Sequence, residues 1–335
     1  MKPHIVALFL MSILICSCTS HKKELLSLPE PAEIHSDSIL VPPVILSATR
    51  MFIAHDMLVI YEQQKDTLFS FWKLPQCQYL FSAGSKGEGP DELLLLDRVF
   101  VETANGFKTF ELPSNKIKDL KIDIVGDGRL KLYADKRLAI DQIPLNRFTF
   151  LSDSSYCFLS NNEEYEYTLL DKENNIHSFS PYPDLLYGRN EEAKAYLYNK
   201  LLVGKPDGEK FASFYAYIKM MKIYDKNGNM LKELLMEQPT DVTNDESRFA
   251  YYSTFPYATD QYIYVLANEL DGWKYLQIWS WEGVPIAHYI LDQSVDTFVV
   301  SEKYKKIYAI SNDRDNVIYT CLLYTSPSPR DSTSS

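Results

Sequence analysis

Short apolar runs that alternate with polar positions recur along the chain, and they are clearest between residues 262 and 291. The runs at 262–266, 275–279 and 285–291 are rich in β-branched and aromatic residues. Asn, Asp and Gly occupy the turns between these runs. Runs of this length, bounded by turn residues, predict antiparallel β-strands joined by hairpins.

The same order of runs repeats with a nearly constant period. When the runs are aligned on the second strand of each unit, successive units lie 50, 48, 56, 51 and 44 residues apart. These second strands are predicted to begin at Met57, Phe107, Ser155, Phe211, Tyr262 and Lys306. A period of about 40 to 50 residues is typical of β-propellers, whereas β-sandwiches do not repeat in this way. We therefore predict an all-β fold, a six-bladed β-propeller of four-stranded antiparallel blades over residues 39–320.

Three segments modify this prediction. Residues 190–202 begin with Asn190 and two acidic residues, a pattern that predicts one short helical insertion between the third and fourth units. After residue 305 only two runs follow, at 306–310 and 317–319, so the last blade is predicted to be truncated. Apolar residues at 39–41 and 44–46 are candidates for a strand that joins the last blade and closes the ring.

The N-terminus has the anatomy of a lipoprotein signal peptide. Lys2 precedes an apolar run at 5–15 that is too short to span a bilayer, and Ser17 precedes Cys18. We predict a signal peptide at 1–17, lipidation of Cys18 and a lipidated tether at 18–38 that leads to the propeller. An ordinary cleaved signal peptide is the alternative. Because no acidic run follows Cys18, the anchor is predicted to face the periplasm, in a bacterial cell envelope.

The C-terminus is unlike the rest of the chain. Residues 321–331 resemble the translation, in one reading frame, of the transposon-end adapter used in sequencing libraries. On this match, residues 321–335 are a non-native tail that packs on nothing, and the native sequence stops near Thr320. The alternative is a native tail rich in Ser and Pro.

One glycine-rich loop follows the first blade and carries a family resemblance. Within nine residues it contains Gly84, Gly87, Gly89, Pro90 and Glu92. This loop resembles the Gly-x-Gly-Pro-x-Glu signature of the TolB-like six-bladed β-propeller lipoproteins. The resemblance covers nearly all of the mature chain and implies the fold, but the family has no assigned activity. The five residues form a candidate ligand or partner loop; the alternative is a blade-to-blade connection in which Gly and Pro set the backbone angles.

Candidates for catalysis and metal binding are absent from the sequence. Its histidines have no metal-ligand spacing, and neither His-Glu-x-x-His nor Gly-x-Ser-x-Gly occurs. Residues 225–229 begin like a calcium loop, but Met230 and Met236 replace the glycine and the glutamate that such a loop needs, which favours a hairpin. We therefore predict no catalytic residues, no metal and no cofactor. The remaining mature cysteines, Cys77, Cys157 and Cys321, are predicted to be buried single thiols, although Cys77 and Cys157 could pair.

Two further groups of side chains are candidates for a solvated face, for packing between blades or for sugar binding. Glu163, Glu164 and Glu166 are predicted to form a solvated face beside a turn. Trp279 is predicted to pack between blades, whereas residues 273 and 281 are tryptophans at hairpin turns that either pack or stack on a sugar.

Composition narrows the class of partner. The formal net charge of -11 and the lack of a basic stripe argue against nucleic acid. Loops at the faces of a propeller make broad recognition surfaces, and tyrosines suit contacts with a protein or a glycan. We therefore predict a lipid-anchored, periplasm-facing module that binds or scaffolds an envelope protein or glycan. The alternative is a metal-dependent hydrolase or lactonase of the propeller type, which needs carboxylates from several blades to converge at the central channel.

Overall fold

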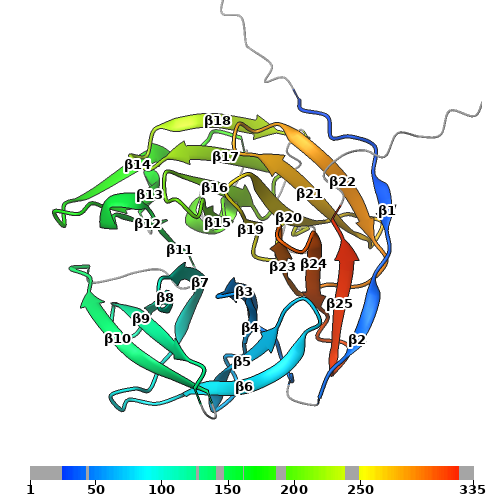
Figure 1. The fold of residues 1–335 in the computed structure, drawn as a ribbon. Coiled ribbons are helices and arrows are strands. Elements are labelled where there is room, and N and C mark those ends of the chain that lie inside the picture. Colours follow the sequence, from blue (N-terminus) through cyan, green and yellow to red (C-terminus); the bar gives the residue numbers. More distant parts are fainter. Residues whose placement is uncertain are drawn as a thin grey trace, which may run out of the picture.

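The computed structural model describes residues 25–42, 45–125, 128–140, 147–160, 162–185, 194–237 and 249–323. Within these residues, six β-sheets stand around a common axis as the blades of a propeller (Figure 1). Each blade starts with an inner strand beside the axis and proceeds outward in chain order. The predicted all-β, six-bladed fold is confirmed.

Blades 1 to 3 each consist of four consecutive antiparallel strands. Blade 1 contains β3 (Arg50–Ala54), β4 (Met57–Tyr61), β5 (Thr67–Lys73) and β6 (Gln78–Ser85). Blade 2 contains β7 (Leu96–Thr103), β8 (Gly106–Glu111), β9 (Lys116–Asp123) and β10 (Arg129–Arg137). Blade 3 contains β11 (Phe148–Phe150), β12 (Tyr156–Leu159), β13 (Tyr165–Leu170) and β14 (Ile176–Pro181), with a 3-10 turn at Ser152–Ser154.

Blades 4 and 5 follow the same order, and blade 6 is shorter. Blade 4 contains β15 (Lys200–Gly204), β16 (Lys210–Tyr215), β17 (Met220–Asp225) and β18 (Met230–Leu235). Blade 5 contains β19 (Tyr257–Ala258), β20 (Tyr262–Asn268), β21 (Lys274–Ser280) and β22 (Pro285–Leu291). Blade 6 takes only three strands from this part of the chain, as its predicted truncation requires: β23 (Thr297–Ser301), β24 (Lys306–Ile310) and β25 (Val317–Leu322).

All six strands that the repeat placed second occupy the second position of their blades. They are β4, β8, β12, β16, β20 and β24. The inner strands β3, β7, β11, β15, β19 and β23 had not been assigned from the sequence, and neither had the outer strand β10. The inner strands contact one another in turn around the axis, so their residues form the wall of the central channel.

The N-terminal segment closes the ring, and it also wraps around it. Strand β2 (Asp37–Leu40) pairs antiparallel with β25 and gives blade 6 its fourth strand, as the apolar run at 39–41 had suggested. Strand β1 (Ala32–Ile34) pairs in parallel with the outer edge of β22. The Leu26 backbone N–H donates to the Leu235 carbonyl at 2.9 Å, which fixes the segment to blade 4 as well.

These contacts correct the predicted tether at 18–38. Its described part, from Leu25 onward, belongs to the propeller and crosses the rims of blades 4, 5 and 6. The polar, Pro-containing composition of this segment did not indicate strands. A strand that adds to an outer edge uses backbone hydrogen bonds and few apolar side chains. Cys18 and the rest of the predicted signal peptide and tether lie outside the described residues.

The predicted helical insertion is shorter than expected. The α-helix α1 covers only Lys194–Leu197, and Lys200–Gly204 is already the inner strand β15 of blade 4. The prediction of a helix to residue 202 is therefore wrong at its C-terminal end, because Lys200 and Leu202 are drawn into strand pairing with β16. Asn190, the expected cap, lies outside the described residues.

The prediction that residues 321–335 pack on nothing is wrong for their first part. Cys321 and Leu322 continue β25 and pair with β24, and both Cys321 and Leu323 are buried. Strand alternation explains this, because residues 317, 319, 321 and 323 all point toward blade 5. Residues 324–335 lie outside the described residues, and the non-native origin of the tail stays a prediction.

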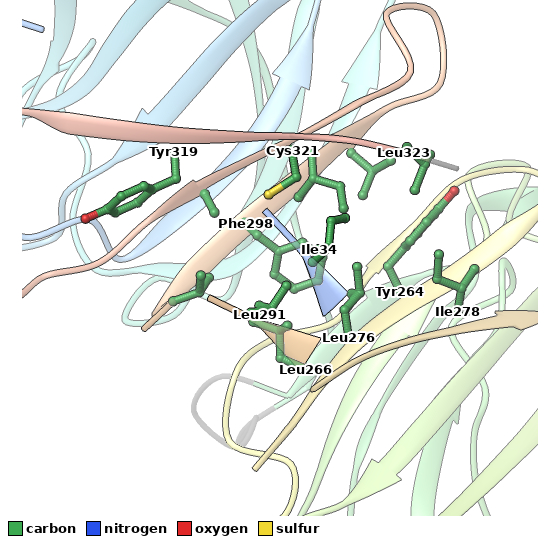
Figure 2. Close-up of a cluster of buried hydrophobic side chains, with 14 of the residues drawn as sticks. Ile34, Tyr264, Leu266, Leu276, Ile278, Leu291, Phe298, Tyr319, Cys321 and Leu323 are labelled. Carbon is green, nitrogen blue, oxygen red and sulfur yellow. The ribbon is translucent and has the colours of Figure 1, made fainter. Parts of the chain in front are cut away.

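A buried apolar cluster fills every interface between neighbouring blades. Figure 2 shows the cluster between blades 5 and 6, where Ile34 of β1 lies among Tyr264, Leu276 and Cys321. Trp279 is fully buried in the cluster between blades 4 and 5, which confirms the packing predicted for it. Cys77 and Cys157 are buried free thiols at two different interfaces, also as predicted.

Candidate functional site

The glycine-rich loop predicted as a contact site connects blade 1 to blade 2. The Gly89 backbone N–H donates to Glu92 Oε2 at 2.8 Å, so the glutamate holds the loop closed on itself. A side chain at Gly87 would place its Cβ 2.1 Å from the same carboxylate oxygen, which explains the glycine. Gly84 lies at the end of β6, while Pro90 is exposed. These contacts assign a role to Glu92 within the loop; the role in binding a ligand or partner stays a prediction.

The other sequence candidates fall in different environments. Trp281 is buried, and its indole N–H donates to the Thr259 carbonyl at 3.0 Å, so it serves packing. Trp273 is 53% exposed at the turn between β20 and β21, so its role in packing or in sugar binding stays a prediction. The segment 225–229 is a hairpin closed by the Asp225 carboxylate, which accepts from two backbone N–H groups, as predicted.

Glu166 corrects the prediction of a solvated acidic face. Glu163 and Glu164 are exposed, but Glu166 is 1% exposed at the interface of blades 3 and 4. Its carboxylate accepts hydrogen bonds from Lys200 at 2.5 Å and from Lys222 at 2.6 Å. We call these three residues, together with Tyr215 and Ser180, which also donate to Glu166, the blade 3–4 ion network.

Within the blade 3–4 ion network, burial and ion pairing shift the pKa values in opposite directions. Burial alone would raise the pKa of Glu166, but the charges of Lys200 and Lys222 outweigh it and hold that pKa below its ordinary value. Burial also lowers the pKa of Lys200 to about 8, against the attraction of Glu166. None of the cavities near the channel has these three side chains on its wall, so the network fits a structural role.

The central channel contains a cavity of about 410 Å³. Inner strands from blades 1 to 5 supply its wall, together with Phe255, which precedes β19. A second hollow of about 300 Å³ shares Phe255 with this cavity, and Arg147 is among its lining residues. The size of the main cavity is within the range of about 300 to 1,000 Å³ that small-molecule sites occupy.

Three arginines from consecutive blades gather where the inner strands begin. Arg50 starts β3, Arg98 is near the start of β7, and Arg147 directly precedes β11. Arg50 is held in place, because its guanidinium donates to the carbonyls of Phe255 at 2.8 Å and Pro256 at 2.7 Å. We call Arg50, Arg98 and Arg147 the channel arginines.

The channel arginines differ in how they are compensated. The guanidinium of Arg98 lies 5.3 Å from the centroid of the Phe255 ring, and that of Arg50 lies 5.7 Å from it. Among the described residues, neither Arg98 nor Arg147 forms an ion pair, and Arg98 Nε is buried without a hydrogen-bond partner. Burial lowers the pKa of Arg147 and lowers that of Arg50 to about 10. Half-buried guanidinium groups without a carboxylate partner are uncommon, because burial of an unpaired charge is costly.

Asp97 lies among the channel arginines and is 1% exposed. Its Oδ2 atom has no hydrogen-bond partner among the described residues. Burial raises the pKa of Asp97 to about 7, although backbone N–H groups and Arg98 act to lower it. This end of the channel therefore carries more positive than negative charge, in a protein whose formal net charge is -11.

Among the described residues, the channel presents no carboxylate cluster of the kind that the hydrolase alternative needs. Within the part of the chain that the structure describes, no group of three or more His, Cys, Asp and Glu side chains could hold a metal ion. No helix of these residues is long and apolar enough to cross a membrane. The arginines and aromatic rings instead make the channel suited to an anion. Sequence analysis missed these arginines, and the local signal was the charged pair Asp97-Arg98 between the apolar residues Leu96 and Val99.

Ring topology and blade number define the class of protein, a six-bladed β-propeller with a cationic central channel. The sequence matches the family described as TolB-like 6-blade propeller-like over residues 33–303, and the chain belongs to this family. No curated protein matches the chain.

Solved structures agree on the architecture alone. A member of the duf4221 family from Bacteroides vulgatus is 8% identical with a TM-score of 0.57, covering 89% of this chain and 97% of its own. Raptor from Chaetomium thermophilum is 10% identical with a TM-score of 0.48, and the match covers 89% of this chain and 30% of that protein. At these identities the likeness concerns the fold and not the function.

Proposed function

We propose that this protein is a lipid-anchored, periplasm-facing binding module that recognises its ligand or partner on one face of the ring. The observation that carries the proposal is the cavity of the central channel, together with the second hollow that shares Phe255 with it. Arg98 lines the cavity, Arg147 lines the hollow, and neither forms an ion pair with the described residues. Cavities with a few convergent polar groups are the usual binding sites of proteins. We call the face on which the inner strands begin the connection face.

Topology puts the other candidate segments on the connection face as well. The loop at 86–95, helix α1 (Lys194–Leu197) and residues 249–256 each lead from an outer strand to the inner strand of the next blade. All connections of this kind lie on the same face of a propeller, and clustered loops are where recognition surfaces form. The channel arginines open toward this face, since they lie where inner strands begin. A partner bound there would contact the loop and the channel together.

The test is affinity capture from the native envelope with the full chain and two charge-reversal variants. Glu88→Lys alters an exposed residue of the loop on the connection face, and Glu173→Lys makes the same change on the opposite face. The proposal predicts a captured partner that is lost with Glu88→Lys and kept with Glu173→Lys. Equal capture by both variants would contradict it. Turnover of a lactone or glycan that stops on chelation and returns with a divalent metal would favour the hydrolase instead.

Anchoring needs its own test, because Cys18 lies outside the described residues. Cys18→Ser should release the protein from the membrane fraction and leave the propeller folded, because the lipid contributes membrane affinity and no core contact. Mass spectrometry of the wild type should detect the diacylglycerol on Cys18. A variant that stays membrane-bound, together with a wild type that carries no lipid mass, would contradict the proposed anchor.

A further inference from the structure

The channel arginines have a geometry that selects among anions. They come from three consecutive blades: Arg50 and Arg98 line the main cavity, Arg147 lines the second hollow, and Phe255 is on the wall of both. Arg50 is oriented by two backbone carbonyls, whereas Arg98 and Arg147 form no ion pair within the described residues. A guanidinium presents a planar fork of donors that matches a carboxylate in a bidentate way. Two such forks, free of protein carboxylates, leave room for an external one.

Asp97 does not neutralise this cluster. It interacts electrostatically with Arg50, Arg98 and Arg147, but it forms no ion pair with any of them. Its unpartnered Oδ2 is also buried at the cavity wall. A second acidic group brought near Asp97 is tolerated best when it carries a single charge, because like charges at short distance repel. A monoanion therefore fits this place better than a dianion.

Aromatic rings give the cavity an apolar stretch of wall, beside polar lining residues that include Glu102, Lys108 and Asp207. Phe255 covers the guanidinium groups of Arg50 and Arg98, and Phe100, Phe148 and Phe150 line the wall farther along. At that deeper position the Lys108 ammonium stands 4.7 Å from the centroid of the Phe150 ring. Ring faces of this kind bind flat apolar groups, which an inorganic anion lacks.

We propose that the channel binds a small organic monocarboxylate, with its carboxylate between Arg98 and Arg147 and its flat apolar body against the aromatic wall. The inference rests on the proposed binding function and names the chemistry of one ligand of that site. Arg50 positions Phe255 and contributes positive charge, while the two free guanidinium groups make the contacts. The cavity volume of about 410 Å³ admits a body of the size of two fused rings.

Calorimetric titration of the purified propeller with 2-naphthoate tests this directly. Two further probes separate the parts of the ligand: 2-naphthalenemethanol keeps the rings without the charge, and inorganic phosphate keeps a charge without the rings. We expect 2-naphthoate to bind at least tenfold more tightly than 2-naphthalenemethanol, and 10-fold excess phosphate not to displace it. Equal binding of the alcohol, displacement by phosphate, or no binding of 2-naphthoate would each overturn the proposal.

Variants locate the binding to the channel. The double variant Arg98→Gln and Arg147→Gln should weaken 2-naphthoate at least tenfold, whereas Lys116→Gln with Lys303→Gln removes two exposed cations elsewhere and should leave affinity unchanged. Circular dichroism checks that each variant is folded. Unchanged affinity in the arginine variant would overturn the proposal. Because envelope capture uses loop variants and no small ligand, a partner captured there would keep the binding function even if 2-naphthoate failed.

Discussion

Glu166 at the interface of blades 3 and 4 accepts hydrogen bonds from two lysines and a tyrosine, whereas Arg98 and Arg147 at the channel have no ion-pair partner within the described residues. Both groups contain charged side chains that are buried or half-buried, and the residues of each group come from more than one blade. In the blade 3–4 ion network the opposite charge is supplied by the chain itself. At the channel, the described carboxyl that interacts with all three arginines is Asp97, whose pKa burial raises to about 7.

The difference separates charges that are compensated within the chain from charges that, as we propose, a ligand compensates. A buried ion must be compensated, or its desolvation reduces stability by several kcal/mol. The lysines and Glu166 meet that need internally and fix how blade 4 sits on blade 3. Within the described residues, Arg98 and Arg147 have no such ion pair, and the anion proposed above would offset the cost of their burial. Three variants probe this comparison, in order of expected effect, and the first of them has a matched control.

The largest effect is expected from Glu166→Gln. Removing this one charge leaves Lys200 and Lys222 buried beside each other, and breaking a buried pair in this way costs about 3 to 5 kcal/mol. The free energy of unfolding, measured by urea denaturation at pH 7, should fall by that amount. Lys200 would also give up its proton more readily than its present pKa of about 8 implies.

The matched control is Asp135→Asn. Asp135 pairs with Lys116 at 2.7 Å, but both side chains are 36% exposed, so water screens the pair. Its loss should cost at most about 1 kcal/mol. Equal losses in Glu166→Gln and Asp135→Asn would show that burial does not distinguish the network from an ordinary surface pair.

Asp97→Asn is expected to act in the opposite direction and to depend on pH. The folded-state pKa of Asp97, about 7, lies above its ordinary value of 3.8. Between these values the unfolded chain holds fewer protons than the folded one, so stability falls as pH rises from about 4 to 7. The variant should therefore be more stable than the wild type at pH 8, by about 2 to 4 kcal/mol.

Urea midpoints at pH 4 and pH 8 measure this effect. The wild type should lose stability between the two values relative to the variant, and the two proteins should be close to equal at pH 4, where Asp97 is protonated in the folded state. If the pH dependence of both proteins were the same, Asp97 would not be the buried carboxyl that the comparison requires.

Strand order was accessible from the sequence because it depends on local patterns. Each second strand is a run rich in apolar residues between turns. Such a run can be recognised in the sequence without knowing which strands pair with it. Strand β10 and the edge strand β1 were not accessible, since most of their residues are exposed and their pairing is made by the backbone. The helix reading failed at Lys200 for a related reason: strand pairing with β16 overrode the local helical preference.

The candidate site was much less accessible. Glu166, Lys200 and Lys222 come from three strands and two blades, so no spacing along the chain shows that they meet. The sequence contains one sign of them, since Glu166 and Lys222 each lie between apolar or aromatic neighbours within a strand, and a charge in such a place requires a partner. Asp97-Arg98 in β7 show the same pattern of charged residues beside apolar neighbours. An isolated charge in the sequence does not show whether its partner belongs to the chain or to a ligand. In the structure, Glu166 is paired within the chain, whereas Arg98 and Arg147 form no ion pair with the described residues.

The smallest effect on stability is expected from Arg98→Gln combined with Arg147→Gln. Neither arginine forms an ion pair within the described residues, and burial already lowers the pKa of Arg147, so the substitutions remove a desolvation cost together with some contact area. The free energy of unfolding should change by no more than about 1 kcal/mol in either direction, against the loss of several kcal/mol expected for Glu166→Gln. Urea denaturation in ligand-free buffer measures it. A loss above about 2 kcal/mol would place these arginines with Glu166 among the charges that hold the fold, and they would no longer be a site kept open for an anion.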